Sequence, residues 1–178
     1  MQQTILALAA ILIFSLYTLS RHESDAGLER ISITAEYETA AAGLARARLH
    51  EIQRRAFDEA DVGRDGMRSS TQGLTPSNQL GREAGETNES SYDDLDDFNG
   101  IARPVSAERN GETLSFRDSV SVRYLDPSDP TASPNRSLAK EITVIVTAVP
   151  SGYIGKAPVM ARLRRVVTPA SGAAHTTN

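Results

Sequence analysis

The chain has 178 residues, a length that suits one domain with an anchor or loose segments and not two full globular domains. Aromatic residues make up 5% and Trp is absent, so the chain can bury only a modest, mainly aliphatic core. The formal net charge is -4 and acidic groups concentrate over residues 83–97, which argues against nucleic-acid binding. Because there is no cysteine, disulfides, thiolate metal sites and a cysteine nucleophile are excluded.

Residues 4–19 form an apolar run without a charged side chain, which indicates either a membrane anchor or a secretory signal. A helix over this run is somewhat short for a hydrocarbon core of about 30 Å, but it can span if the bilayer thins locally. A cleavable secretory signal is the alternative. Such signals begin with positively charged residues, whereas Met1, Gln2 and Gln3 have no charged side chain. We therefore expect residues 1–20 to form an uncleaved transmembrane and assembly helix. The expected assembly contacts are Ile5, Leu8, Leu12, Phe14 and Leu16.

An amphipathic continuation of this helix is predicted over residues 21–62. Apolar residues recur at spacings of three, four or seven between Leu28 and Ala56, with many alanines among them. This pattern favours a helix that packs on its own domain over a free coiled coil. Gly63 is expected to end it.

A local break is expected between the anchor and the amphipathic part. The segment from Ser20 to Glu23 matches a capping box, which normally begins a new helix. Gly27 is a poor helix former.

The rest of the chain reads as a loop followed by a sheet. Residues 63–91 are polar and rich in small residues, which predicts a long loop. Residues 92–169 show the alternation of an antiparallel β-sheet domain, and residues 170–178 are expected to be a disordered tail. The strand candidates are 113–116, 119–124, 138–149 and 159–164, with turns at 126–135 and 150–152. The strongest, 138–149, is expected to be central, with one face on the helix.

The predicted fold class is α+β, in which a long membrane-anchoring helix continues as an amphipathic helix packed on a small antiparallel sheet. This layout resembles type IV pilins and pseudopilins. Three stretches, 47–58, 92–100 and 139–146, resemble the D-type minor pilins of mannose-sensitive haemagglutinin pili, and the Asp-Asp-Leu-Asp-Asp block at 93–97 is the distinctive one.

The resemblance implies a structural protein without enzymatic activity. Such a subunit is held in the bacterial inner membrane before assembly. It then joins other pilin-like subunits through its N-terminal helix, in an extracellular filament, its tip or a periplasmic complex, with roles in adhesion or secretion.

Two features differ from that family. Its short basic leader, which ends in Gly before a Phe-Thr-Leu-x-Glu start, is not found, and Ile5 stands at the position of the family's fifth-residue glutamate if residue 1 is the mature start. In the family that carboxylate meets the terminal amine of an adjacent subunit. A subunit with Ile5 cannot make this contact, so an initiating tip subunit is expected. The alternative is a filament whose N-terminal amine is satisfied by backbone carbonyls or Thr4 and whose helices pack through small residues such as Ala7, Ala9 and Ala10.

The acidic block is the candidate metal site. Hard oxygen ligands of the kind that calcium prefers occur within a few residues, although without the full EF-hand spacing. They are Asp93, Asp94, Asp96, Asp97 and Asn99. The alternative is a solvated acidic turn, with Tyr92 and Phe98 docking it onto the sheet.

Other chemistry is not indicated by the sequence. No nucleophile elbow, Walker loop or dinucleotide glycine pattern occurs, and the histidines form no ligand spacing, so we expect no enzyme and no cofactor beyond calcium. Arg162, Arg164 and Arg165 are interpreted as the solvent-exposed face of a strand.

The alternatives to an assembly subunit are a monomeric membrane-anchored module that binds calcium or a surface ligand, and a non-filament partner in a secretion or envelope complex.

Overall fold

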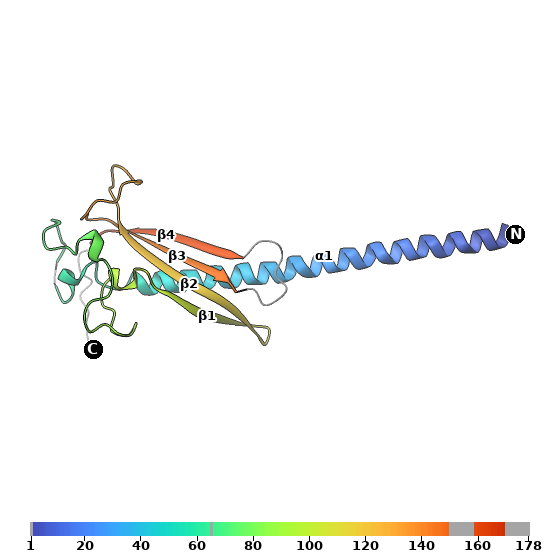
Figure 1. Ribbon diagram of the computed structural model, residues 1–178, viewed down its shortest axis with the longest axis horizontal. Helices are drawn as coiled ribbons and strands as arrows, with labels where there is room; N and C mark the ends of the chain where they lie inside the picture. Colours follow the sequence, from blue (N-terminus) through green and yellow to red (C-terminus); the bar gives the residue numbers. More distant parts are fainter. Residues whose placement is uncertain (1, 65, 150–158, 170–178) are drawn as a thin grey trace.

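The computed structural model describes residues 2–64, 66–149 and 159–169. Its longest element is a single helix, α1 (Gln2–Ile52), of 51 residues. Figure 1 shows that the N-terminal part of α1 projects alone, whereas its C-terminal part lies beside the sheet. The break expected between Ser20 and Gly27 is wrong, because the helical backbone is continuous there. A lone glycine costs about 1 kcal/mol relative to alanine, which long helical flanks can absorb.

The helix ends at Ile52, before the boundary expected at residue 62. The chain turns away because Ala56 pairs with Asp94 in an isolated parallel bridge, and Phe57 and Asp58 enter the core. Gly63, at φ 66, follows only a single 3-10 turn, Glu59–Asp61. Burial of a polar and an aromatic side chain thus overrides the helical pattern of the sequence.

Four antiparallel strands form one sheet in the order β1-β2-β3-β4. They are β1 (Ala102–Arg109), β2 (Glu112–Tyr124), β3 (Lys140–Ala148) and β4 (Met160–Val167). Asn110 and Gly111 join β1 to β2, with φ values of 51° and 82°. Positive φ at both positions is the mark of a tight hairpin whose twist matches that of its strands.

The antiparallel sheet is confirmed, with differences in its strands. β3 is central, as predicted, and it packs with β4 against α1. The candidates 113–116 and 119–124 are parts of one long strand, β2. β1 was not predicted: it is an edge strand that contains Pro104 and is mostly exposed on its outer face.

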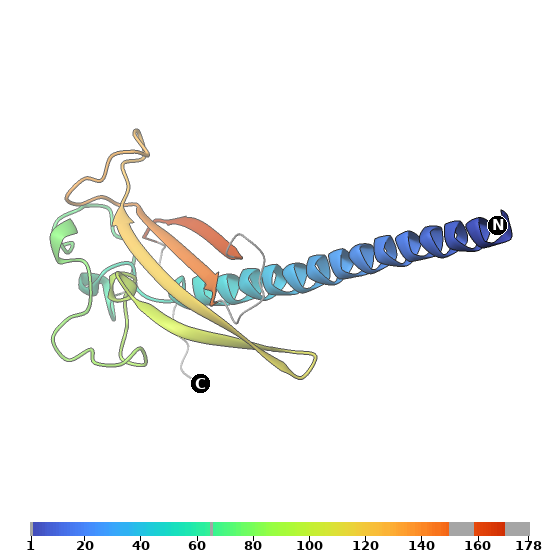
Figure 2. The same cartoon turned by 45° about the vertical axis from the view of Figure 1, so that its right-hand side comes forward.

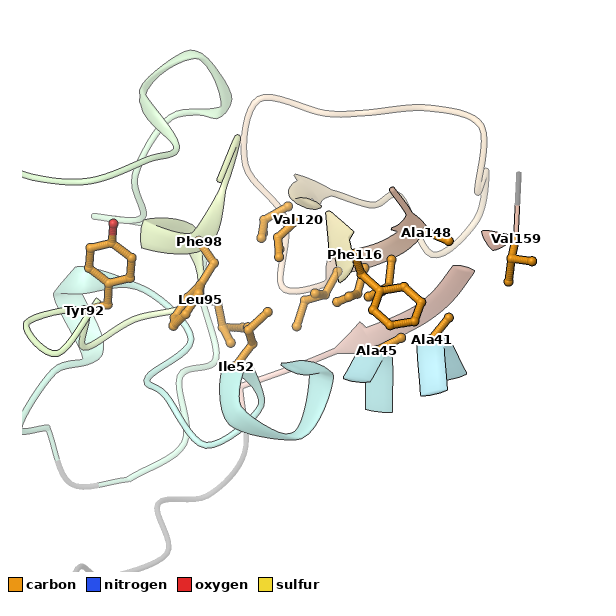
Figure 3. Packing of buried hydrophobic residues seen from close by; sticks show 14 of the residues in the cluster. Ala41, Ala45, Ile52, Tyr92, Leu95, Phe98, Phe116, Val120, Ala148 and Val159 are labelled. Atoms are coloured by element: carbon orange, nitrogen blue, oxygen red, sulfur yellow. The ribbon is translucent and has the colours of Figure 1, made fainter. Parts of the chain in front are cut away.

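The core lies between the C-terminal part of α1 and one face of the sheet. Figure 3 shows Ala41 and Ala45 of α1 facing Phe116 of β2. Their small side chains let the helix approach the sheet closely. The Tyr37 ring packs on Phe116 with 5.6 Å between ring centroids.

The segments between α1 and β1 close the end of the core that lies far from the N-terminus, as Figure 2 shows. Leu74, in the predicted long loop, is 1% exposed, so this loop is anchored to the core at that point. Tyr92 and Phe98 are buried with ring centroids 5.1 Å apart, which confirms the predicted docking of the acidic block. The turn at 150–152 and the tail at 170–178 lie outside the described residues.

Candidate functional site

The N-terminal part of α1 is a bare apolar surface. Ile5–Glu23 has a mean hydropathy of 1.6 and none of it is buried. By length and composition it can cross a membrane, although a signal sequence would pass the same test. Each predicted assembly contact has 61–68% of its surface exposed: Ile5, Leu8, Leu12, Phe14 and Leu16. Such a surface requires lipid or other apolar helices around it.

Exposed apolar side chains continue beyond this span. Leu28 and Ile31 are 65% and 67% exposed, and Ile33 is 39% exposed. The first buried residue of α1 after them is Tyr37, where contact with the sheet begins. A segment outside both the candidate span and the domain therefore carries apolar side chains that its own domain does not cover.

The opposite end of the domain contains a buried charge cluster centred on Lys140. This side chain and those of Asp58 and Asp96 have no exposed surface. The Lys140 Nζ donates to Asp96 Oδ1 at 2.5 Å, to the Phe57 carbonyl at 2.6 Å and to Asp58 Oδ2 at 3.1 Å. An ammonium group has three donor hydrogens, so all three are used and the buried charge is compensated.

Asp58 is held in this position by neighbouring donors. Its Oδ1 accepts the Ala60 amide and so caps the 3-10 turn, and its Oδ2 accepts the Thr75 amide at 3.1 Å. The Tyr124 hydroxyl donates to the Thr75 carbonyl at 2.8 Å and lies 3.2 Å from Asp58 Oδ2. The pair of Lys140 and Asp58 thus joins the segment after α1, the long loop and the sheet.

The acidic block is folded by its own carboxylates. Asp94 Oδ1 accepts the amides of Asp96 and Asp97, and Asp97 Oδ2 accepts those of Asp93 and Asp94. The side chains of Asp94, Asp96 and Asp97 are buried, which corrects the alternative of a solvated turn.

The predicted calcium ligands do not form one cluster. Asp93 is exposed, and Asp96 faces Lys140. Asn99 donates to the Leu80 carbonyl and accepts the Val122 amide. Only Asp97 belongs to the carboxylate group with metal-like geometry that occurs among the described residues.

That group contains two residues from the long loop, Glu83 and Glu86. One oxygen of each of these side chains and one of Asp97 all lie within 4.8 Å of one another. The Glu83 amide donates to Glu86 Oε2 at 2.9 Å, and the Glu86 amide donates to the Glu83 carbonyl at 3.2 Å. These bonds close a tight turn that aims both glutamates at Asp97.

Crowding of like charges perturbs this region. Burial, with the neighbouring carboxylates of Glu86 and Asp97, raises the pKa of Glu83 to about 8. Burial, with the adjacent charge of Asp96, raises the pKa of Asp94 to about 9. The pKa of Asp97 is also raised, first by burial and then by Glu86. Glu83, Asp94 and Asp97 therefore favour a proton or a cation. The pKa of Glu86 is lowered instead, because burial is outweighed by hydrogen bonds that involve Asp97 and the Glu83 amide.

A second charge network lies between α1 and the sheet. Arg48, with a side chain 3% exposed, makes a two-pronged contact with Glu89 at 3.0 Å and also lies 3.1 Å from Asp118. Arg103 of β1 reaches Glu89 at 2.6 Å. An open cavity of about 140 Å³ lies beside these groups. We interpret the network as structural, because its charges compensate one another.

Comparison with known proteins does not identify the chain. No family model matches it, and neither the curated proteins nor the solved structures gave a significant match. The resemblance to minor pilins thus stays a prediction.

Sequence reasoning missed Asp58, Glu83, Glu86 and Lys140. One signal was present for Lys140: it has the same phase as Ile142, Val144 and Val146, which predicts an inward side chain. Glu83 and Glu86 had no comparable signal, because only the path of the loop brings them to Asp97. Arg162, Arg164 and Arg165 are all exposed, but Arg165 pairs with the buried Ile142 and so lies on the other face of β4 from Arg162 and Arg164. The interpretation of all three as one solvent-exposed face is therefore wrong for Arg165.

Proposed function

We propose that the protein is a structural subunit of a pilin-like assembly. The N-terminal half of α1 is held in the membrane and then packs with equivalent helices of partner subunits. The sheet domain forms the outer surface. The resemblance of the acidic block and two flanking stretches to D-type minor pilins supports placement in a bacterial envelope filament, its tip or a related complex.

The exposed apolar residues outside the candidate span carry this proposal. A monomeric anchor needs apolar side chains only within the hydrocarbon core. Leu28 and Ile31 lie beyond Glu23, the last residue of the span, and are as exposed as the anchor itself. Association of several helices would cover them, whereas a lone anchored domain would leave them in water.

Cysteine cross-linking can test the assembly, because the native chain has no cysteine. Single Ile31→Cys and Ser70→Cys variants would be oxidised in membranes of cells that express the full chain together with its native partners. Ile31→Cys is expected to give disulfide-linked dimers of this chain, or mixed products with a partner subunit that carries a cysteine at the matching helix position. Ser70 is an exposed loop residue and serves as the control for random collision.

Absence of Ile31-specific products, together with a discrete monomer after detergent extraction, would contradict the proposal. That result would favour a monomeric anchored binding module. Sheared filaments that contain the chain would support the assembly directly.

A further inference from the structure

Glu83, Glu86 and Asp97 converge although no positive charge holds them together. Among the described residues, no arginine or lysine forms an ion pair with any of the three. Two further acidic residues, Glu59 and Asp93, lie near this group. Glu59 interacts with Asp93 and is close enough to Glu86 and Asp97 for their charges to repel its own. Carboxylates this close repel one another unless protons or a cation intervene.

Asp97 supplies a second, independent observation. Its side chain is fully buried, and no donor in the part of the chain that the structure describes bonds to its Oδ1. Its Oδ2 is fixed by the amides of Asp93 and Asp94, so the orientation of the carboxylate is set by the backbone. Glu83 Oε2 is likewise buried and unpartnered. A buried, unpartnered carboxylate oxygen costs free energy, and a bound ion would recover it.

We propose that Glu83, Glu86 and Asp97 bind a hard divalent cation, with calcium as the ion that suits these ligands. The proposal goes beyond assembly and does not depend on it. The site shares Asp97 with the predicted calcium block but takes its other ligands from the long loop.

The geometry fits the coordination chemistry of calcium. Calcium takes oxygen ligands at about 2.3–2.6 Å, so two ligand atoms on opposite sides of one ion stand about 5 Å apart. The three carboxylate oxygens lie within 4.8 Å of one another and can share such an ion. Calcium takes about six to eight oxygens, and water can supply the rest. Glu83 and Glu59 line an open cleft of about 450 Å³, so one of the three proposed ligands borders space that solvent can enter.

A bound ion would fasten the long loop to the buried charge cluster. Asp97 follows Asp96, whose carboxylate faces Lys140, and precedes Phe98 in the core. Glu83 and Glu86 belong to a turn stabilised by its own backbone and side-chain bonds. The ion therefore joins an exposed loop to a rigid part of the domain, and it would stabilise the folded state by mass action.

The test is thermal unfolding of the full chain in detergent micelles, followed by circular dichroism. About 5 mM CaCl₂ exceeds the dissociation constants of about 0.1–1 mM found for extracellular calcium modules. It is expected to raise Tm by about 2 °C or more. NaCl at the same ionic strength is expected to leave Tm nearly unchanged. Equilibrium dialysis is expected to find one calcium ion bound per chain.

The double variant Glu83→Gln with Glu86→Gln removes two ligands and keeps side-chain oxygens that can accept the loop amide. It is expected to lose the calcium-dependent rise while its Tm without calcium stays equal or increases, because repulsion is relieved. The matched control, Glu108→Gln with Glu112→Gln, changes two exposed glutamates of the β1–β2 hairpin and should keep the rise. An equal response to NaCl, or a calcium response retained in the first variant, would overturn the proposal.

Discussion

Lys140 and Asp58 lie 82 positions apart in the chain and meet in the core, with 3.1 Å between Nζ and Oδ2. Neither side chain has exposed surface. Removing two such charges from water costs several kcal/mol per ion, and this cost is offset only when geometry and further hydrogen bonds are good. Here Asp96 and the Phe57 carbonyl complete the coordination of the ammonium group.

Replacing Lys140 with Met is expected to lower the free energy of unfolding by about 3–5 kcal/mol, because Asp58 and Asp96 would lose their buried counter-charge. Urea denaturation of the full chain in detergent, followed by circular dichroism, measures the loss. Arg117→Met is the control: Arg117 is exposed on β2, and its replacement should change stability by about 0.5 kcal/mol or less. Equal effects of the two substitutions would show that the buried cluster contributes little.

The position of Lys140 could be predicted from the sequence, but its partners could not. Alternate side chains of a strand share one face, so Lys140 lies on the same buried face as Ile142 and Val144. Asp58 reaches it only because α1 ends early, and Asp96 only because the acidic block folds inward. The positions of Asp58 and Asp96 thus depend on contacts between distant segments, which the periodicity of the sequence cannot predict.

The same difference between local pattern and distant contacts explains which strands the sequence predicts. β3 is β-branched and alternates cleanly, so its local pattern was sufficient. β1 is polar and contains Pro104, and only its pairing with β2 makes it a strand. Asn110-Gly111 was the available signal, because this dipeptide favours the tight hairpin turn that joins the two strands.

Stability is expected to fall as the pH rises, with Asp94 as one cause. Burial raises the pKa of Asp94 to about 9, whereas the carboxyl of the unfolded chain loses its proton at about pH 4. Between those values the folded state binds more protons than the unfolded state, and the free energy of unfolding decreases with rising pH. The decrease is at most about 1.4 kcal/mol per pH unit for one proton.

Asp94→Asn removes this titration, and its amide oxygen can still accept the amides of Asp96 and Asp97. The stability of this variant relative to the parent should increase from about pH 5 to about pH 8. Asp126→Asn is the control: Asp126 is exposed and hydrogen bonds from Ser128 lower its pKa, so its difference from the parent should not increase over that range. Parallel pH profiles of Asp94→Asn and the parent would contradict the assigned proton.

Arg48→Lys is expected to lower the free energy of unfolding by about 2 kcal/mol. An ammonium group cannot make the two-pronged contact with Glu89 and also reach Asp118, so at least one buried charged hydrogen bond is lost. Arg103→Lys is the matched control, since Arg103 contacts the same two acids but is 41% exposed, and it should cost about 1 kcal/mol or less. Urea denaturation compares the two, and equal losses would contradict a special role for the buried guanidinium.

Leu12→Arg tests the anchor, because Leu12 lies near the middle of the Ile5–Glu23 span and is 62% exposed to whatever surrounds the helix. A charge at the centre of a membrane helix costs about 2.5–3.5 kcal/mol on insertion scales. The variant should therefore shift from the membrane to the soluble or degraded fraction when cells that express the full chain are fractionated. Leu12→Ala keeps the helix uncharged and should stay with the membrane. Retention of Leu12→Arg at the level of the parent would show that this helix does not depend on the hydrocarbon core, and its exposed side chains would then need partner helices alone to cover them.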